Sequence, residues 1–105
     1  MDTLVVFTNL PDRASAEALA RRLVEERLAA CVNVLAPCRS AYRWKGAVQQ
    51  EEEHPVLIKT TRARYAALEQ LIRAEHPYEL PEIVALPVAM GLPAYLDWVR
   101  NETGP

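Results

Sequence analysis

Two long extended segments, residues 31–44 and 47–61, flank the dipeptide Lys45-Gly46 and most constrain how this chain can fold. Their apolar and polar residues alternate close to that dipeptide, which is a plausible hairpin turn. Each arm has roughly 14 residues and would span ~46 Å at the rise of a strand. A helix of ~15 residues covers only ~22 Å. We therefore expect a hairpin about twice as long as the helices that cover it.

The uncovered end of this hairpin carries Tyr42, Trp44 and Val48, which are poorly suited to full exposure in water. Long uncovered strand edges also invite pairing with another chain. The simplest arrangement is a closed oligomer in which each hairpin docks on a neighbour, with these side chains as interface anchors. Pro37 and Pro55 each remove a ladder donor, so both positions are expected at bulges or edges.

The remaining segments predict a single α+β domain over residues 1–105. Continuous apolar runs indicate two further strands, and three- and four-residue spacing of apolar side chains indicates helices. The resulting order is strand, helix, strand, strand, helix, strand and a last helix, which is the ferredoxin-like split βαβ arrangement with an antiparallel sheet. We place the two further strands at residues 4–8 and 83–86, and the helices at 16–28, 63–75 and from Pro93.

Composition excludes several classes of function. A formal net charge of −2 and a sequence pI near 5.7 argue against a nucleic-acid binder, which needs a basic excess. No apolar stretch reaches the ~18 residues that span a bilayer, so no membrane partner is expected. The start, Met1-Asp2, lacks the basic region of a secretory signal, which favours the cytoplasm. Cys31 and Cys38 are then expected as reduced thiols.

Five short motifs occur in order along the chain, at the spacing of a known family. The chain resembles the CutA divalent-cation tolerance proteins over nearly its full length. This resemblance implies a ferredoxin-like, cytoplasmic homotrimer linked to tolerance of copper and other divalent metals. It implies no established reaction, and the sequence has no nucleophile elbow, P-loop or nucleotide-binding glycine motif, so we expect no enzyme. The motifs are Leu28-Ala29-Ala30-Cys31-Val32-Asn33, Tyr42-Arg43-Trp44-Lys45-Gly46, Lys59-Thr60-Thr61, His76-Pro77-Tyr78 and Pro81-Glu82-Ile83.

His76 is the strongest candidate metal ligand in the sequence. It lies at a predicted helix end beside Glu75 and Glu79, and Cys38 is the second soft donor considered. The plainer interpretation is a histidine favoured by the negative end of the helix dipole. The family resemblance supports a copper-linked histidine here, although enteric relatives have a second histidine where this chain has Glu75, and a first-strand cysteine where it has Phe7. We expect copper or another divalent cation, weakly bound.

A second candidate site centres on Lys59, which follows three apolar residues and therefore needs water or a partner. Glu82 is the expected partner in a structural ion pair. Alternatively, Lys59, Tyr78 and Glu82 form an inter-subunit cleft with Trp44 of a neighbouring hairpin, a mixture typical of small-molecule pockets. By fold analogy with the PII signalling proteins, that cleft suggests a regulatory or sensor trimer. The acids at 51–53 are either a solvated stretch or weak cation ligands.

Overall fold

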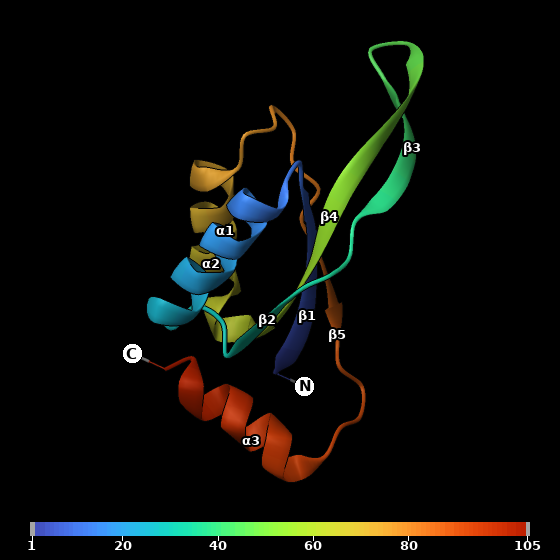
Figure 1. The fold of residues 1–105 in the computed structure, drawn as a ribbon. Helices are drawn as coiled ribbons and strands as arrows, with labels where there is room; N and C mark the ends of the chain where they lie inside the picture. Colours follow the sequence, from blue (N-terminus) through green and yellow to red (C-terminus); the bar gives the residue numbers. More distant parts are fainter. Residues whose placement is uncertain (1, 105) are drawn as a thin grey trace.

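The structure is a computed structural model that describes residues 2–104, and its elements follow the predicted order (Figure 1). Antiparallel pairing gives the sheet order β2-β4-β1-β5, with β3 paired to β4. The α+β prediction is therefore confirmed. The strands are β1 (Thr3–Leu10), β2 (Cys31–Val34), β3 (Cys38–Trp44), β4 (Ala47–Thr61) and β5 (Val84–Pro87), and the helices are α1 (Arg13–Glu25), α2 (Arg62–Glu75) and α3 (Pro93–Glu102).

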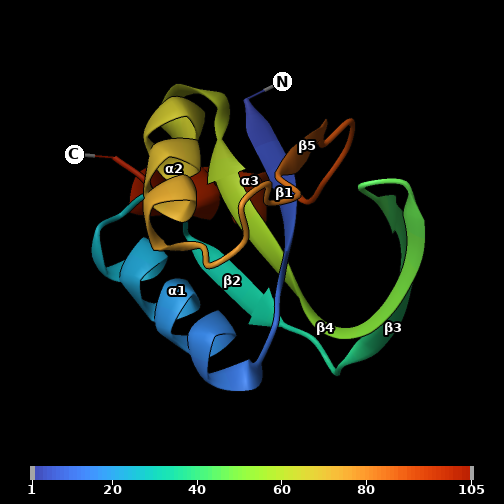
Figure 2. The same cartoon turned by 90° about the horizontal axis from the view of Figure 1, so that it is seen from above.

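Helices α1 and α2 cover one face of the sheet, and the hydrophobic core lies between them (Figures 1 and 2). Strand β1 alternates so that Leu4, Val6 and Leu10 face the helices, which is the period of a half-covered strand. The helix α1 begins at the N-cap Asp12, whose carboxylate accepts the amide of Ser15 at 2.7 Å. The core also includes Ala16, Leu19, Leu23, Leu28, Ala29, Val56, Ile58, Leu68 and Ile72.

Strand β4 continues past the core, and its first half forms a hairpin with β3 (Figure 2). We call β3 together with residues 47–53 the hook, because the hairpin curls back toward the body of the molecule. The predicted turn is confirmed: Lys45 has φ of 50° and Gly46 has φ of 83°, as a tight hairpin of this hand requires.

The prediction of a bulge or edge at Pro55 is wrong. Pro55 lies inside β4, paired with Asn9 of β1, and its carbonyl accepts the amide of Leu35 at 2.9 Å. The interruption falls only on the other arm, at residues 35–37, between β2 and β3. A proline has no backbone N–H, but its carbonyl can still accept a hydrogen bond. A central position is therefore tolerated where the neighbouring strand donates an amide and does not require one in return.

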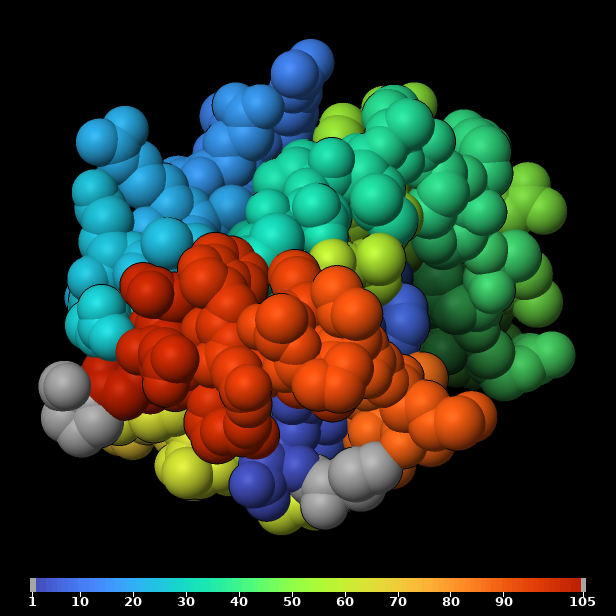
Figure 3. Space-filling view, turned by 90° about the horizontal axis from the view of Figure 1, so that it is seen from below, coloured from blue at the N-terminus to red at the C-terminus, as the bar shows by residue number. Residues whose placement is uncertain are grey.

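Helix α3 lies across the lower end of the molecule (Figure 1) and forms part of the face seen from below (Figure 3). Several large apolar side chains on and before this helix are exposed. Only Val99 of this helix is buried, whereas Leu92, Tyr95 and Trp98 are exposed. The strand β5 before it exposes Leu86 in the same way. Within residues 2–104, no helix has the length and hydropathy needed to cross a membrane.

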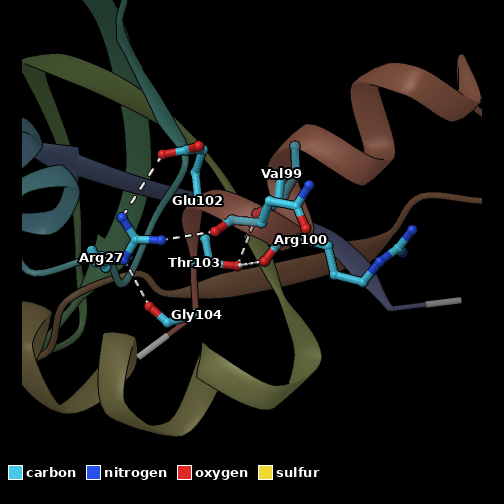
Figure 4. A network of polar contacts seen from close by, with 7 residues as sticks. Arg27, Val99, Arg100, Glu102, Thr103 and Gly104 are labelled. Carbon is cyan, nitrogen blue, oxygen red and sulfur yellow. Dashed lines mark hydrogen bonds and ion pairs between the residues drawn. The ribbon is translucent and has the colours of Figure 1, made fainter.

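Arg27 ties the end of the α1 segment to the C-terminal end of α3 (Figure 4). Its Nε donates to the carbonyl of Gly104 and its Nη2 to the carbonyl of Asn101, both at 2.8 Å. Its Nη1 lies 3.8 Å from Glu102 Oε1. Carbonyls at a helix end have no partner within the helix, so the guanidinium caps α3. Arg27 does this from a left-handed backbone conformation, with φ of 58°.

Replacing Arg27 with alanine should lower the free energy of unfolding by about 1–2 kcal/mol, because hydrogen bonds from a charged group are lost. Arg27→Gly should be less destabilised than Arg27→Ala by about 1 kcal/mol, since glycine adopts the left-handed conformation without cost. Urea unfolding measures both differences.

Arg21→Ala is the matched control, because Arg21 forms only an exposed ion pair with Glu25 on α1. It should change the stability by less than about 0.5 kcal/mol. Equal effects of Arg27→Ala and Arg21→Ala would contradict the role of Arg27 as a cap.

Candidate functional site

A cleft of about 1040 Å³ lies between the inner face of the hook and the loop that leads from α2 to β5. Figure 3 shows the molecule hollowed between the green hairpin and the orange segment that includes β5. Its volume is at the upper end of the range of small-molecule sites. The lining residues are Asn9, Ser40, Ala41, Tyr42, Trp44, Gln49, Glu51, Glu53 and residues 77–84.

The strand register decides which side chains of the hook face the cleft. Residues opposite each other in an antiparallel pair project to the same face, and successive residues alternate between faces. Tyr42 lies opposite Gln49, and Ser40 opposite Glu51. These residues form the inner face together with Trp44 and Glu53, which follow at even spacing.

Carboxylates dominate the charge of the cleft. Glu51 and Glu53 come from β4, and Glu79 and Glu82 come from the loop. Among the described lining residues none is Lys, Arg or His. Glu79 has a partner at the tip of the hook, because its Oε1 lies 3.7 Å from Lys45 Nζ. The cleft therefore presents a negative potential to its contents.

Two phenols form hydrogen bonds with two of these carboxylates. The hydroxyl of Tyr42 donates to Glu51, and this bond raises the pKa of Tyr42 to about 12. Burial, together with a hydrogen bond to Glu53, raises the pKa of Tyr78 well above its usual value. Both phenols therefore keep their protons at neutral pH and act as donors.

His76 holds the beginning of the loop against β1. Its Nε2 lies 2.7 Å from the carbonyl of Asn9, and its Nδ1 accepts the backbone amide of Tyr78 at 3.2 Å. The second bond needs an unprotonated Nδ1, so the proton is on Nε2 and the ring is neutral. Burial lowers the pKa of His76, against smaller raising effects of the Asn9 carbonyl and the Glu53 charge.

The residues predicted as metal ligands are engaged with different partners. Glu75 pairs with Arg22 on α1, and Glu79 with Lys45 at the hook. The Sγ of Cys38 lies 3.6 Å from the hydroxyl of Ser40. Within residues 2–104, no three Cys, His, Asp or Glu side chains are grouped so that they could hold a metal ion. The single chain thus offers scattered donors rather than a closed site.

The residues predicted for the second site are only partly brought together. Trp44, Tyr78 and Glu82 line one cleft within a single chain, so a neighbouring hairpin is not needed to assemble them. The predicted Lys59–Glu82 ion pair is wrong: Lys59 Nζ donates to Asn33 Oδ1, and Glu82 accepts from Asn9 Nδ2 at 3.0 Å. Lys59 is not among the lining residues.

The predicted interface residues divide between the two faces of the hook. Tyr42 and Trp44 are on the inner face, whereas Val48 lies opposite Arg43 and therefore projects from the outer face. The side chain of Val48 is 63% exposed and touches little of its own chain.

Asn9 was not a predicted site residue, although it contacts both Glu82 and His76. In the sequence, Glu51 and Glu53 stand out only as members of an acidic run. The alternation was a usable signal for these two acids: counting from the Lys45-Gly46 turn puts them on the face of Tyr42 and Trp44. No local signal connects Asn9 to a loop that lies so far away along the chain.

The comparisons with known proteins agree on one family. The family model described as "CutA1 divalent ion tolerance protein" matches residues 4–102. The divalent-cation tolerance protein CutA of Thermus thermophilus is 48% identical, over 95% of this chain and 97% of its own length. Protein CutA of Mus musculus is 43% identical over 92% of this chain. The chain spans almost all of the bacterial relative but 55% of the mouse protein.

Solved structures give the same result. The chain matches the crystal structure of CutA from Xylella fastidiosa with a TM-score of 0.96 at 43% identity, covering 99% of this chain and 100% of the other. It matches the structure of the divalent cation tolerance protein from Thermus thermophilus with a TM-score of 0.95 at 47% identity, covering 97% and 99%.

The lowered pKa of His76 predicts how stability changes with pH. A folded-state pKa below the unfolded value means that stabilisation is complete above about pH 6.5 and declines as the pH falls through the folded value. His76→Gln should remove this part of the decline between about pH 7.5 and about pH 5.5. It should also lower stability at about pH 7.5 by about 1–2 kcal/mol, since buried hydrogen bonds are lost.

Urea unfolding at each pH measures this effect, and His54→Gln, which replaces the other histidine of the chain, is the control. An unchanged pH dependence in His76→Gln would show that the neutral imidazole does not hold the loop.

Proposed function

Because the chain belongs to the CutA1 divalent ion tolerance protein family, we propose that it acts in divalent-cation tolerance as a cytoplasmic homotrimer that binds metal ions weakly. The proposed role is binding rather than catalysis, since the family is described by ion tolerance and not by a reaction. Two free thiols, Cys31 and Cys38, support the reducing compartment.

The observation that carries the proposal is the composition of the cleft: four carboxylates and no basic side chain among its described lining residues. Carboxylate oxygens are hard ligands, which suit Mn²⁺, Mg²⁺ and Ca²⁺ better than copper. Because these carboxylates are spread along the hook and the loop, we propose loose binding with water completing the coordination.

Copper binding is proposed at His76. The ring nitrogen available to a metal is Nδ1, because its bond from the amide of Tyr78, at 3.2 Å, is longer than the bond between Nε2 and Asn9. A copper ion there would displace that amide and gain the nearby charge of Glu53. Glu75, Glu79 and Cys38 would have to leave their present partners to join it.

Calorimetric titration with Mn²⁺ should give a dissociation constant of about 10⁻⁴–10⁻³ M, the range of the weakest Ca²⁺-binding modules, which also use oxygen ligands. The double variant Glu51→Gln with Glu82→Gln should weaken Mn²⁺ binding at least about tenfold. The control Glu17→Gln with Glu25→Gln removes two exposed carboxylates from α1 instead. Copper titration of His76→Gln tests the imidazole separately. Identical Mn²⁺ curves for both double variants would rule out the cleft as the metal site.

The exposed apolar side chains support the trimer. They lie on the hook, on β5, on α3 and on the loops before β5 and α3, and exposed apolar surface marks association sites. Tyr42 and Trp44 are proposed to contribute from the inner face and Val48 from the outer face of the hook. The large exposed side chains involved are Tyr42, Val48, Leu80, Val84, Leu86, Met90, Leu92, Tyr95 and Trp98.

Analytical ultracentrifugation should show a trimer for the wild type and dissociation for Val48→Asp with Trp98→Asp. Both positions are exposed in the single chain, so the changes leave its core intact. The control, Ala67→Asp with Gln70→Asp, adds the same charge to the exposed face of α2. A monomeric wild type at micromolar concentration would contradict the proposal, and so would a variant that stays trimeric.

A second function is favoured by the aromatic rings of the cleft. Tyr42, Trp44 and Tyr78 line it together with the carboxylates, which is the mixture of apolar walls and few polar groups found in small-molecule sites. We propose as the alternative a sensor or regulatory trimer that binds a small ligand there.

A further inference from the structure

Glu53 is a buried carboxylate that faces the cleft without a cationic partner. Glu53 is only 7% exposed, and it lines the cleft. Among the residues that the structure describes, no ion pair includes it. Its identified donor is the neutral phenol of Tyr78, and the neighbouring His76 is also neutral. Buried charges are normally paired, so a positive group is missing here.

The walls around Glu53 indicate what kind of positive group fits. Three aromatic rings, those of Tyr42, Trp44 and Tyr78, face the same space. Aromatic faces attract ammonium and guanidinium groups, and more strongly where water is excluded. An anion would meet the carboxylates of Glu51, Glu53 and Glu82 with no base among the described lining residues.

The rim of the cleft already holds one ammonium group in this way. Lys45 Nζ lies 5.6 Å from the centre of the Trp44 ring and 3.7 Å from Glu79 Oε1. An ammonium held between an aromatic face and a carboxylate is therefore compatible with this hook and this loop. Lys45 lies at the tip, so it leaves the deeper carboxylate of Glu53 unpaired.

We propose that the cleft binds a small organic cation, with an ammonium or guanidinium group at Glu53 and an apolar body between the rings of Trp44 and Tyr78. This inference rests on the second proposed function, the small-ligand sensor, and specifies its ligand class. The cation supplies the charge that Glu53 lacks, and the phenols of Tyr42 and Tyr78 remain donors to their own carboxylates.

The test uses benzylammonium as the probe and benzyl alcohol as its neutral counterpart, in calorimetric titrations of the full chain near neutral pH with EDTA present. Benzylammonium should bind at least about tenfold more tightly than benzyl alcohol, because only the cation pairs with Glu53. Glu53→Gln should weaken benzylammonium binding at least about tenfold and leave benzyl alcohol unchanged.

Glu52→Gln is the matched control: it removes one charge from the adjacent residue, which lies opposite Arg39 on the outer face of the hook. Trp44→Leu is the second variant, because it weakens binding of the probe without changing the charge, even if Glu53→Gln does not fold. Since Trp44 is also a proposed interface residue, this variant is compared with the wild type only when the two sediment alike. Equal binding of the amine and the alcohol, equal losses in Glu52→Gln and Glu53→Gln, or no binding to the assembled wild type would each overturn the inference.

This experiment does not test the proposed metal binding, since EDTA removes divalent ions from it. The two proposals can therefore succeed or fail independently. Mn²⁺ binding without benzylammonium binding refutes the organic-cation inference alone. Benzylammonium binding without Mn²⁺ binding supports the inference and refutes the metal proposal.

Discussion

Strand β4 belongs both to the main sheet and to the hook, and the arrangement of the rest of the molecule depends on this shared strand. Its residues 54–61 pair with β1 and carry Val56 and Ile58 into the core, whereas residues 47–53 pair only with β3. Because backbone pairing is continuous along one strand, packing in the core determines the direction in which the hook leaves it. The inner face of the hook is thus positioned by side chains that never touch the cleft.

The opposite wall of the cleft is held by polar contacts instead of packing. His76 bonds to the carbonyl of Asn9, and the side chain of Asn9 bonds to Glu82, so one residue of β1 anchors both ends of the loop. The Lys45–Glu79 pair joins the loop to the tip of the hook, but it is exposed and contributes little energy. A core-supported wall faces a wall held by a few hydrogen bonds, so the loop is the side that can adjust to a ligand.

Local patterns in the sequence predicted the helices and strands well, but they did not predict the contacts between residues far apart in the chain. Alternation and turn chemistry predicted the hairpin and its Lys45-Gly46 turn, and Pro93 correctly marked the start of α3, because these depend on neighbouring residues. The predicted partner of Lys59, Glu82, was wrong. Lys59 bonds instead to Asn33 on the adjacent strand β2, and the pairing of β2 with β4 cannot be read from the order of residues in the sequence. The cap formed by Arg27 depends on how α3 packs and has no signal in the sequence.

The central claim is that the inner face of the hook, with its loop, is a cation site. Paramagnetic broadening of backbone amide signals by substoichiometric Mn²⁺ in the isotope-labelled protein tests it most directly, because broadening depends on distance from the ion. The account predicts that the amides of residues 49–53 and 78–80 and of Glu82 lose intensity first, before the amides near the exposed carboxylates Glu17 and Glu25 of α1. Equal broadening of both regions, or broadening confined to α1, would contradict it.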